Sequence, residues 1–144
     1  MEAAYEFFWL VSRFEYALKN FPEFRQSNEV GPALASWVSF AKTLPEDFFI
    51  NIAAEGIAAE ILNQPPKKLV VDEDGRLRWQ PSTNAVDNES LFESVRVIRN
   101  NLFHGSKHDF EKNQRDQLLV SEAHQVLQKA LGYAPQVAEK AYSS

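Results

Sequence analysis

The helical character of this chain is clearest in the stretch NESLFESVRVIRNNLFHG, residues 88–105. On a helix that turns by about 100° per residue, four apolar side chains share one narrow stripe, those of Leu91, Val95, Ile98 and Leu102. This spacing predicts an amphipathic helix with its apolar side against a core. Asn88 or Ser90 can cap the start of the helix, and Gly105 can supply the left-handed residue that ends it.

Helical periodicity also dominates the sequence on both sides of this stretch. It predicts helices over residues 4–18, 32–43, 45–62 and 112–131, and a short helical turn within 135–142. From residue 48 to 62 the helix predicted over 45–62 is apolar nearly all round, which is typical of a helix at the centre of a bundle.

One segment predicts β structure. Residues 68–71 and 76–79 flank an acidic turn whose Asp74-Gly75 pair favours a tight hairpin. We expect this hairpin to pack on the helical body, because an isolated two-stranded hairpin is only marginally stable. Together the patterns predict an all-α fold, an up-and-down bundle of about five helices with a small β-hairpin insertion at about 67–80, in a single domain over residues 1–144.

The composition excludes several classes of functional site. The 144 residues are 44% hydrophobic and include no cysteine, which excludes disulfides, thiolate zinc sites, cysteine nucleophiles and iron–sulfur clusters. The acidic amino end and the lack of an apolar run of about 20 residues predict a cytoplasmic protein without a secretory signal or a membrane partner. A net charge of −5 argues against general coating of nucleic acid, although a local basic patch stays compatible with it.

Arg99 occupies an unusual place on the 88–105 helix. It falls between the core stripe and a second apolar ridge formed by Phe92 and Phe103, where a fully solvated arginine does not belong. One interpretation is a snorkelling side chain or a salt bridge to an acid such as Glu55 or Glu60. The other is that the guanidinium binds an anionic ligand.

Two polar residues accompany Arg99. Asn100 and His104 lie one turn apart on the polar side of the helix, and His104 holds the last helical position. The helix dipole there favours the imidazolium, so we expect the pKa of His104 to rise modestly. His104 can therefore serve as an acid–base group or simply as a C-terminal cap.

The seven residues RNNLFHG, Arg99 to Gly105, resemble the signature of the HEPN superfamily, in which a polar residue follows an arginine and a histidine comes a few positions later. The resemblance implies an all-α bundle that commonly pairs as a homodimer, with the two motif faces meeting at a shared cleft. Many members are metal-independent endoribonucleases, often toxins of toxin–antitoxin, abortive-infection or CRISPR systems.

The resemblance also assigns roles to the motif residues. Arg99 would bind the scissile phosphate and stabilise its developing charge. His104 would act as general base or acid on the ribose 2′-hydroxyl or the leaving oxygen, and Asn100 would orient the phosphate or the histidine. Such chemistry needs no metal and no cofactor, requires RNA because of its 2′-hydroxyl, and leaves a 2′,3′-cyclic phosphate.

The charge around the motif fits an RNA substrate. Residues 94–115 carry five basic and two acidic side chains, a net charge of +3, so the rest of the chain carries −8. The candidate RNA-binding residues besides the motif are Arg96, Ser106, Lys107, Lys112 and Arg115. His108 is a weaker candidate for chemistry, and we expect His124 to be structural or exposed.

One position departs from a HEPN subgroup. Toxins paired with nucleotidyltransferase antitoxins carry a tyrosine two residues after the histidine, where this chain has Ser106. We therefore do not predict that pairing, although another antitoxin or regulatory protein stays a possible partner. No metal-spaced histidine pair occurs, because Gly105 interrupts the helix between His104 and His108.

Two further hypotheses stay open. The chain could be a non-catalytic HEPN-like module that binds RNA, a nucleotide or a protein through the same residues. Alternatively, Arg99 could be only a salt-bridge partner, in which case its removal would unfold the protein. We expect the three tryptophans, Trp9, Trp37 and Trp79, to lie in the core or at an interface.

Overall fold

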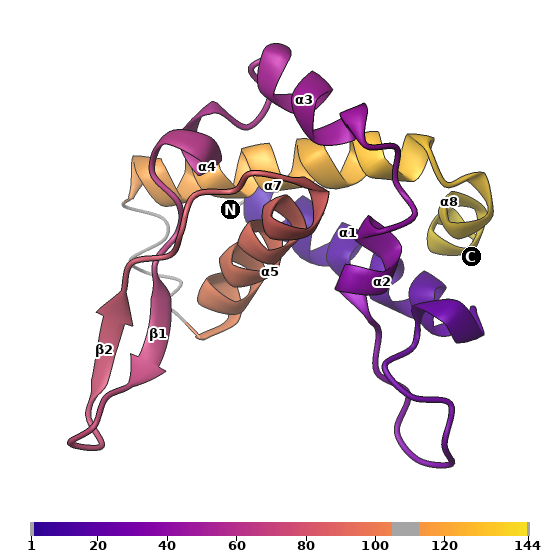
Figure 1. Cartoon of the computed structure of the whole chain (residues 1–144), viewed down its shortest axis with the longest axis horizontal. Coiled ribbons are helices and arrows are strands. Elements are labelled where there is room, and N and C mark those ends of the chain that lie inside the picture. Colours follow the sequence, from indigo (N-terminus) through magenta and orange to yellow (C-terminus); the bar gives the residue numbers. More distant parts are fainter. Residues whose placement is uncertain (1, 105–112, 144) are drawn as a thin grey trace.

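The computed structural model describes residues 2–104 and 113–143, which are mostly helical with one small antiparallel sheet (Figure 1). The long helices are α1 (Glu2–Lys19), α5 (Asn88–His104) and α7 (Gln114–Gly132). The shorter helices are η1 (Pro22–Phe24), α2 (Trp37–Ala41), α3 (Asp47–Ala54), α4 (Ala59–Asn63) and α8 (Pro135–Tyr142). The sheet consists of β1 (Lys68–Val71) and β2 (Leu77–Gln80). No helix within the described ranges is both long and apolar enough to cross a bilayer.

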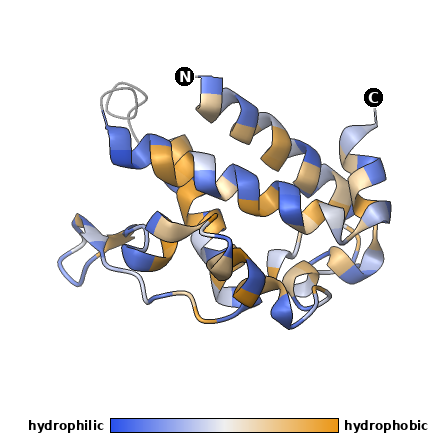
Figure 2. Ribbon diagram, turned by 90° about the horizontal axis from the view of Figure 1, so that it is seen from above, coloured by the Kyte–Doolittle hydropathy of each residue, from blue (hydrophilic) through white to orange (hydrophobic). Residues whose placement is uncertain are grey.

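The core is rich in phenylalanine. Phe40 of α2 and Phe92 of α5 stack edge-on with their ring centroids 5.7 Å apart, and Phe14 of α1 lies 5.0 Å from Phe40. The predicted stripe of α5 is confirmed, since Leu91, Val95 and Ile98 are buried and Leu102 packs against the core. Helix α5 packs against α2, α7 and α1, and α1 and α7 run side by side (Figure 2).

The predicted helix over 45–62 is wrong, because the chain forms two short helices there, α3 and α4. Gly56, with φ +71°, takes the left-handed conformation that ends the first one. The prediction that this segment lies at the centre of the bundle is wrong as well. Ile50 is 64% exposed, and α3 lies at the top edge of the molecule in Figure 1.

Two other boundaries differ from the prediction. The helix expected over 32–43 is only α2, because Ala35 forms a bridge with Arg25 and Ser36 caps the helix through a bond from the Ser39 amide at 3.2 Å. The short turn expected within 135–142 is the whole of α8. The first helix ends before Pro22 as predicted.

The predicted hairpin is present, but its second strand begins and ends one residue later than predicted and the hairpin extends from the body more than expected. Lys68 pairs with Gln80 and Val71 with Leu77. Both strands are mostly exposed and project from the helices in Figure 1. Their link to α5 is polar, through Lys68 Nζ to Glu93 Oε1 at 3.7 Å and Asn101 Nδ2 to the Lys67 carbonyl at 2.9 Å.

The start of α5 is capped by Asp87, not by Asn88 or Ser90 as predicted. Asp87 Oδ1 accepts bonds from the Ser90 amide at 2.8 Å and the Ser90 hydroxyl at 2.6 Å. These bonds hold the pKa of Asp87 below its usual 3.8. Asn88 turns away to bind α3, so the sequence alone assigned the wrong residue at this end.

Three short helices are capped by side chains distant in sequence. Asn88 Oδ1 accepts a bond from the Phe49 amide of α3 at 2.8 Å. The buried Glu122 of α7 accepts bonds from the Glu60 and Ile61 amides of α4 at 3.1 and 3.0 Å. At the end of α8, Arg13 Nε donates to the Ala141 carbonyl at 2.8 Å. The N-terminal ends of α3 and α4 have no side-chain cap of their own.

Candidate functional site

Arg99 pairs with an acid that the sequence did not suggest. Its Nη2 donates to Oε1 of Glu15 on α1 at 2.6 Å, with 26% and 22% of the two side chains exposed. The suggested partners bind elsewhere, since Glu55 pairs with Lys129 at 3.6 Å and Glu60 with Arg115 at 3.1 Å. The prediction of an anionic partner is therefore confirmed, whereas its assignment to Glu55 or Glu60 is wrong.

The rest of the guanidinium is fixed by its own helix. Nη1 of Arg99 donates to Oδ1 of Asn100 at 2.7 Å, and the group lies over the ring of Phe103 at 5.4 Å from its centroid. The Nε atom is buried and is the one buried side-chain polar atom in the described residues without a hydrogen-bond partner. A buried donor left unpaired costs about 1–3 kcal/mol. Glu15 therefore holds the arginine at one nitrogen only and not as a two-bond fork.

Glu15 also connects this group to α2. Its Oε2 accepts a bond from Trp37 Nε1 at 3.0 Å, so one carboxylate contacts both Trp37 and Arg99. Sequence reasoning missed Glu15. The available signal was its place on the wheel, where it borders the core stripe of α1 next to Phe14 and Leu18.

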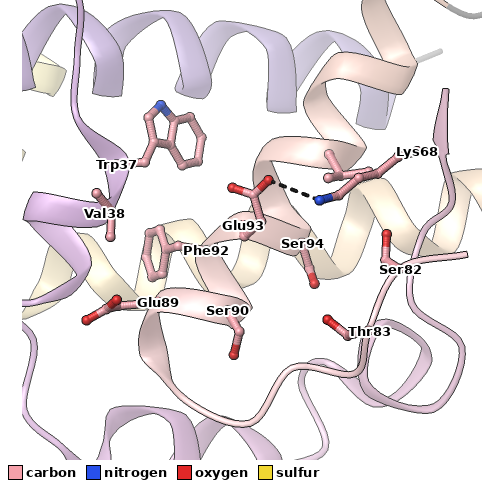
Figure 3. Close-up of a pocket in the computed structure, with 11 residues that line it drawn as sticks. Trp37, Val38, Lys68, Ser82, Thr83, Glu89, Ser90, Phe92, Glu93 and Ser94 are labelled. Carbon is pink, nitrogen blue, oxygen red and sulfur yellow. Dashed lines mark ion pairs between the residues drawn. The ribbon is translucent and has the colours of Figure 1, made fainter. Parts of the chain in front are cut away.

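Trp37 also forms a wall of a hollow of about 290 Å³ between α2, α5 and the segment before α5 (Figure 3). The hydroxyls of Ser82, Thr83 and Ser94 line its opposite side. Arg99 is not part of this lining. The hollow and the candidate site therefore meet only through Trp37.

His104 is the last described residue of α5. Its side chain lies outside the described structure, as do Gly105, Ser106, Lys107, His108 and Lys112. The roles expected of these residues stay predictions. The structure does place Asn100 in contact with Arg99, so two of the three predicted catalytic residues are together.

The basic residues of the segment 94–115 are paired wherever the structure describes them. Arg96 binds Glu93 at 3.2 Å on the same helix, and Arg115 binds Glu60 of α4. With Arg99 on Glu15, each of these three arginines has a carboxylate partner. The segment's positive charge is therefore largely compensated by acids from the rest of the chain, an effect that a count along the sequence cannot show.

Among the described residues no cluster of three or more histidine, aspartate or glutamate side chains is arranged to hold a metal ion. The arrangement around Arg99 can instead bind an oxyanion, because a guanidinium matches carboxylate and phosphate geometry. Comparisons with protein-family models, curated proteins and solved structures found no match for this chain.

Proposed function

We propose that this chain is a HEPN-type, metal-independent endoribonuclease with a cytoplasmic role in toxicity, defence or stress. In this proposal its helices form a HEPN-like up-and-down bundle in a single domain, with the hairpin as an insertion. One observation carries it: the Arg99 side chain is about three-quarters buried and its guanidinium is held by two oxygen acceptors, on the same helix that carries His104. An arginine positioned in this way is suited to bind an oxyanion.

The chemistry follows from these groups. The imidazole of His104 takes the proton of the ribose 2′-hydroxyl while the 2′-oxygen forms a bond to phosphorus. The bond from phosphorus to the 5′-oxygen breaks, and that oxygen receives a proton from an imidazolium. Arg99 neutralises the charge that develops on the non-bridging oxygens, and the amide of Asn100 donates to one of them. The product ends are a 2′,3′-cyclic phosphate and a 5′-hydroxyl.

Glu15 has a defined place in this proposal. A phosphate that approaches Arg99 competes with the Glu15 carboxylate for Nη2. Glu15 thus orients the guanidinium in the free protein and opposes the binding of phosphate to it. Replacing Glu15 with glutamine keeps an acceptor for Trp37 and removes the competing charge.

The proposed active form is a homodimer that pairs through the motif face. Positions five apart differ by about 140° around a helix, so Arg99 and His104 converge more readily when two chains contribute. Phe8 and Phe103 support a pairing surface there, since their rings lie 4.8 Å apart beside Arg99 and are 43% and 46% exposed. RNA would contact Arg96, Ser106, Lys107, Lys112 and Arg115 around it.

The test is cleavage of total RNA by the purified protein with EDTA present. We expect fragments with 2′,3′-cyclic ends from the wild type, none from His104→Ala, and unchanged cleavage by the matched variant His124→Ala. Cleavage that survives in a folded His104→Ala protein would contradict the assignment, as would RNA left intact by a folded wild-type dimer.

A second candidate function is a non-catalytic module that binds RNA, a nucleotide or a regulatory protein such as an antitoxin. The observation that favours it is that Arg99 is already neutralised by Glu15. It predicts binding that depends on Arg99 without any cleavage. A purely structural role for Arg99 predicts instead that Arg99→Ala loses cooperative unfolding, which circular dichroism measures directly.

A further inference from the structure

A second hollow lies on the opposite flank of α1, where that helix meets α7 and α8. Its volume is about 490 Å³. Glu15 and Phe8 face α5 from one side of α1, whereas Trp9 contacts Tyr142 of α8 from the other. This hollow therefore shares no residue with the Arg99 group.

Aromatic rings dominate its lining. Tyr5 and Trp9 follow each other by one turn of α1, and Tyr142 joins them from α8, with its ring centroid 6.2 Å from that of Trp9 and 33° between the planes. The three side chains are 71%, 45% and 53% exposed, respectively. Large aromatic residues that are this exposed and gathered around one hollow offer their negative π-faces to a ligand.

The charge of the lining also favours a cationic ligand. Glu6 is its single acidic residue, and the polar residues besides Glu6 and the aromatic ones are His124 and Gln128 of α7. Burial lowers the pKa of His124, with Glu6 opposing the shift, so the imidazole is neutral at pH 7. The hollow thus carries one negative charge and no basic side chain of its own.

We propose that this hollow binds a trimethylammonium group. Three exposed aromatic rings with one carboxylate attract a bulky, weakly hydrated cation through its charge, and a neutral molecule of the same shape gains only the apolar contact. Leu10, 1% exposed, supplies an apolar floor against which the methyl groups can lie. The group could belong to a free small molecule such as choline or to a trimethylated lysine of another protein.

The first experiment compares choline with its neutral carbon isostere, 3,3-dimethylbutan-1-ol. Titrations followed by the ligand methyl signals in NMR should give a dissociation constant for choline at least about fivefold lower than that of the isostere. Equal binding of the two molecules would overturn the proposal. Failure of choline to saturate the protein at about 50 mM would also overturn it, because the aromatic rings and the carboxylate together should bind choline with at least millimolar affinity.

Variants then locate the binding. Trp9→Leu and Glu6→Gln should each weaken choline binding by about fivefold. The matched controls are Trp79→Leu and Glu73→Gln on the exposed hairpin, which should leave it unchanged. Circular dichroism shows that each variant is folded. Equal effects of the Trp9 and Trp79 substitutions would place binding elsewhere and overturn the proposal.

The two sources of the cation are separated with a short peptide that carries trimethyl-lysine and its unmethylated twin. Binding of the methylated peptide at least about tenfold tighter than choline identifies a protein side chain as the ligand, and weaker binding identifies a free molecule. Equal binding of both peptides would show simple charge attraction and contradict the proposal. RNA cleavage is not a readout here, so this test is independent of the proposed nuclease.

Discussion

Glu15 and Arg99 lie 84 positions apart in the sequence, yet their side chains meet at 2.6 Å. The carboxylate also accepts the indole N–H of Trp37, so it joins helices α1, α2 and α5 at one point. An ion pair with both partners about three-quarters buried is sensitive to loss of either side, because the remaining charge is left partly desolvated. Glu15 is therefore the residue whose substitution tests both the stability of the fold and the chemistry of Arg99.

Glu15→Gln should lower the free energy of unfolding by about 1 kcal/mol, because glutamine keeps a neutral acceptor and loses the charge. Urea denaturation of Glu15→Gln, Arg99→Gln and the double variant measures the coupling, which we expect to be about 0.5–2 kcal/mol. Strictly additive effects would mean that the pair contributes nothing to stability. In the nuclease proposal, the same Glu15→Gln protein should bind RNA more tightly than the wild type.

Glu122→Ala should destabilise the protein by about 2–3 kcal/mol, because two amides of α4 lose a charged acceptor inside the core. Glu122→Gln is the matched control. It retains one acceptor oxygen and should cost about 1 kcal/mol. Equal losses in the two variants, measured by thermal and urea unfolding, would show that packing of the side chain matters and capping does not.

Asn88→Ala should cost about 1–2 kcal/mol, since it leaves the Phe49 amide without its acceptor and removes one of the two donors to the Pro45 carbonyl, which keeps its bond from the Phe48 amide. Asn88→Asp separates the two bonds, because aspartate accepts from Phe49 and cannot donate to Pro45. We expect the aspartate variant to lie between alanine and wild type. An alanine variant as stable as the wild type would rule out a capping role for Asn88.

The stability of the protein should depend on His124 in weakly acidic solution. Burial lowers its pKa in the folded state below the usual 6.5, so the unfolded chain binds the proton more tightly. The stability that comes from neutral His124 is complete above pH 6.5 and is lost as the pH falls toward the folded pKa. Unfolding measured at about pH 7.5 and about pH 5 should therefore differ less in His124→Gln than in the wild type. An identical pH dependence would contradict this.

The sequence predicted the elements that depend on local pattern. The α5 stripe, the end of α1 before Pro22 and the hairpin around Gly75 follow from periodicity and turn chemistry, and all three are present. The break between α3 and α4 could not be found in this way. A single glycine within an apolar run costs a helix only about 1 kcal/mol, so Gly56 alone does not predict the break, and the cap that Glu122 gives to α4 comes from a distant helix.

The candidate site was predictable in part for the same reason. The helical wheel predicted an anionic partner for Arg99, because this position borders the core. It could not choose between acids on other helices, because the choice of Glu15 depends on how α1 packs beside α5. The pairing of Arg115 with Glu60 was hidden for the same reason, because it joins two helices. The pairing of Arg96 with Glu93 lies within one helix and does not depend on how helices pack.

The caps supplied from distant helices bear on the order in which the chain can fold. Helices α3 and α4 span 8 and 5 residues, well short of the roughly 12–15 that an isolated helix needs in water. Their missing amide partners arrive only with Asn88 and Glu122, so a fragment that stops before α5 should leave residues 45–63 without helix. Hydrogen exchange at the Phe49 and Ile61 amides would then report the opening of α5 and α7, and not the fraying of α3 and α4 themselves.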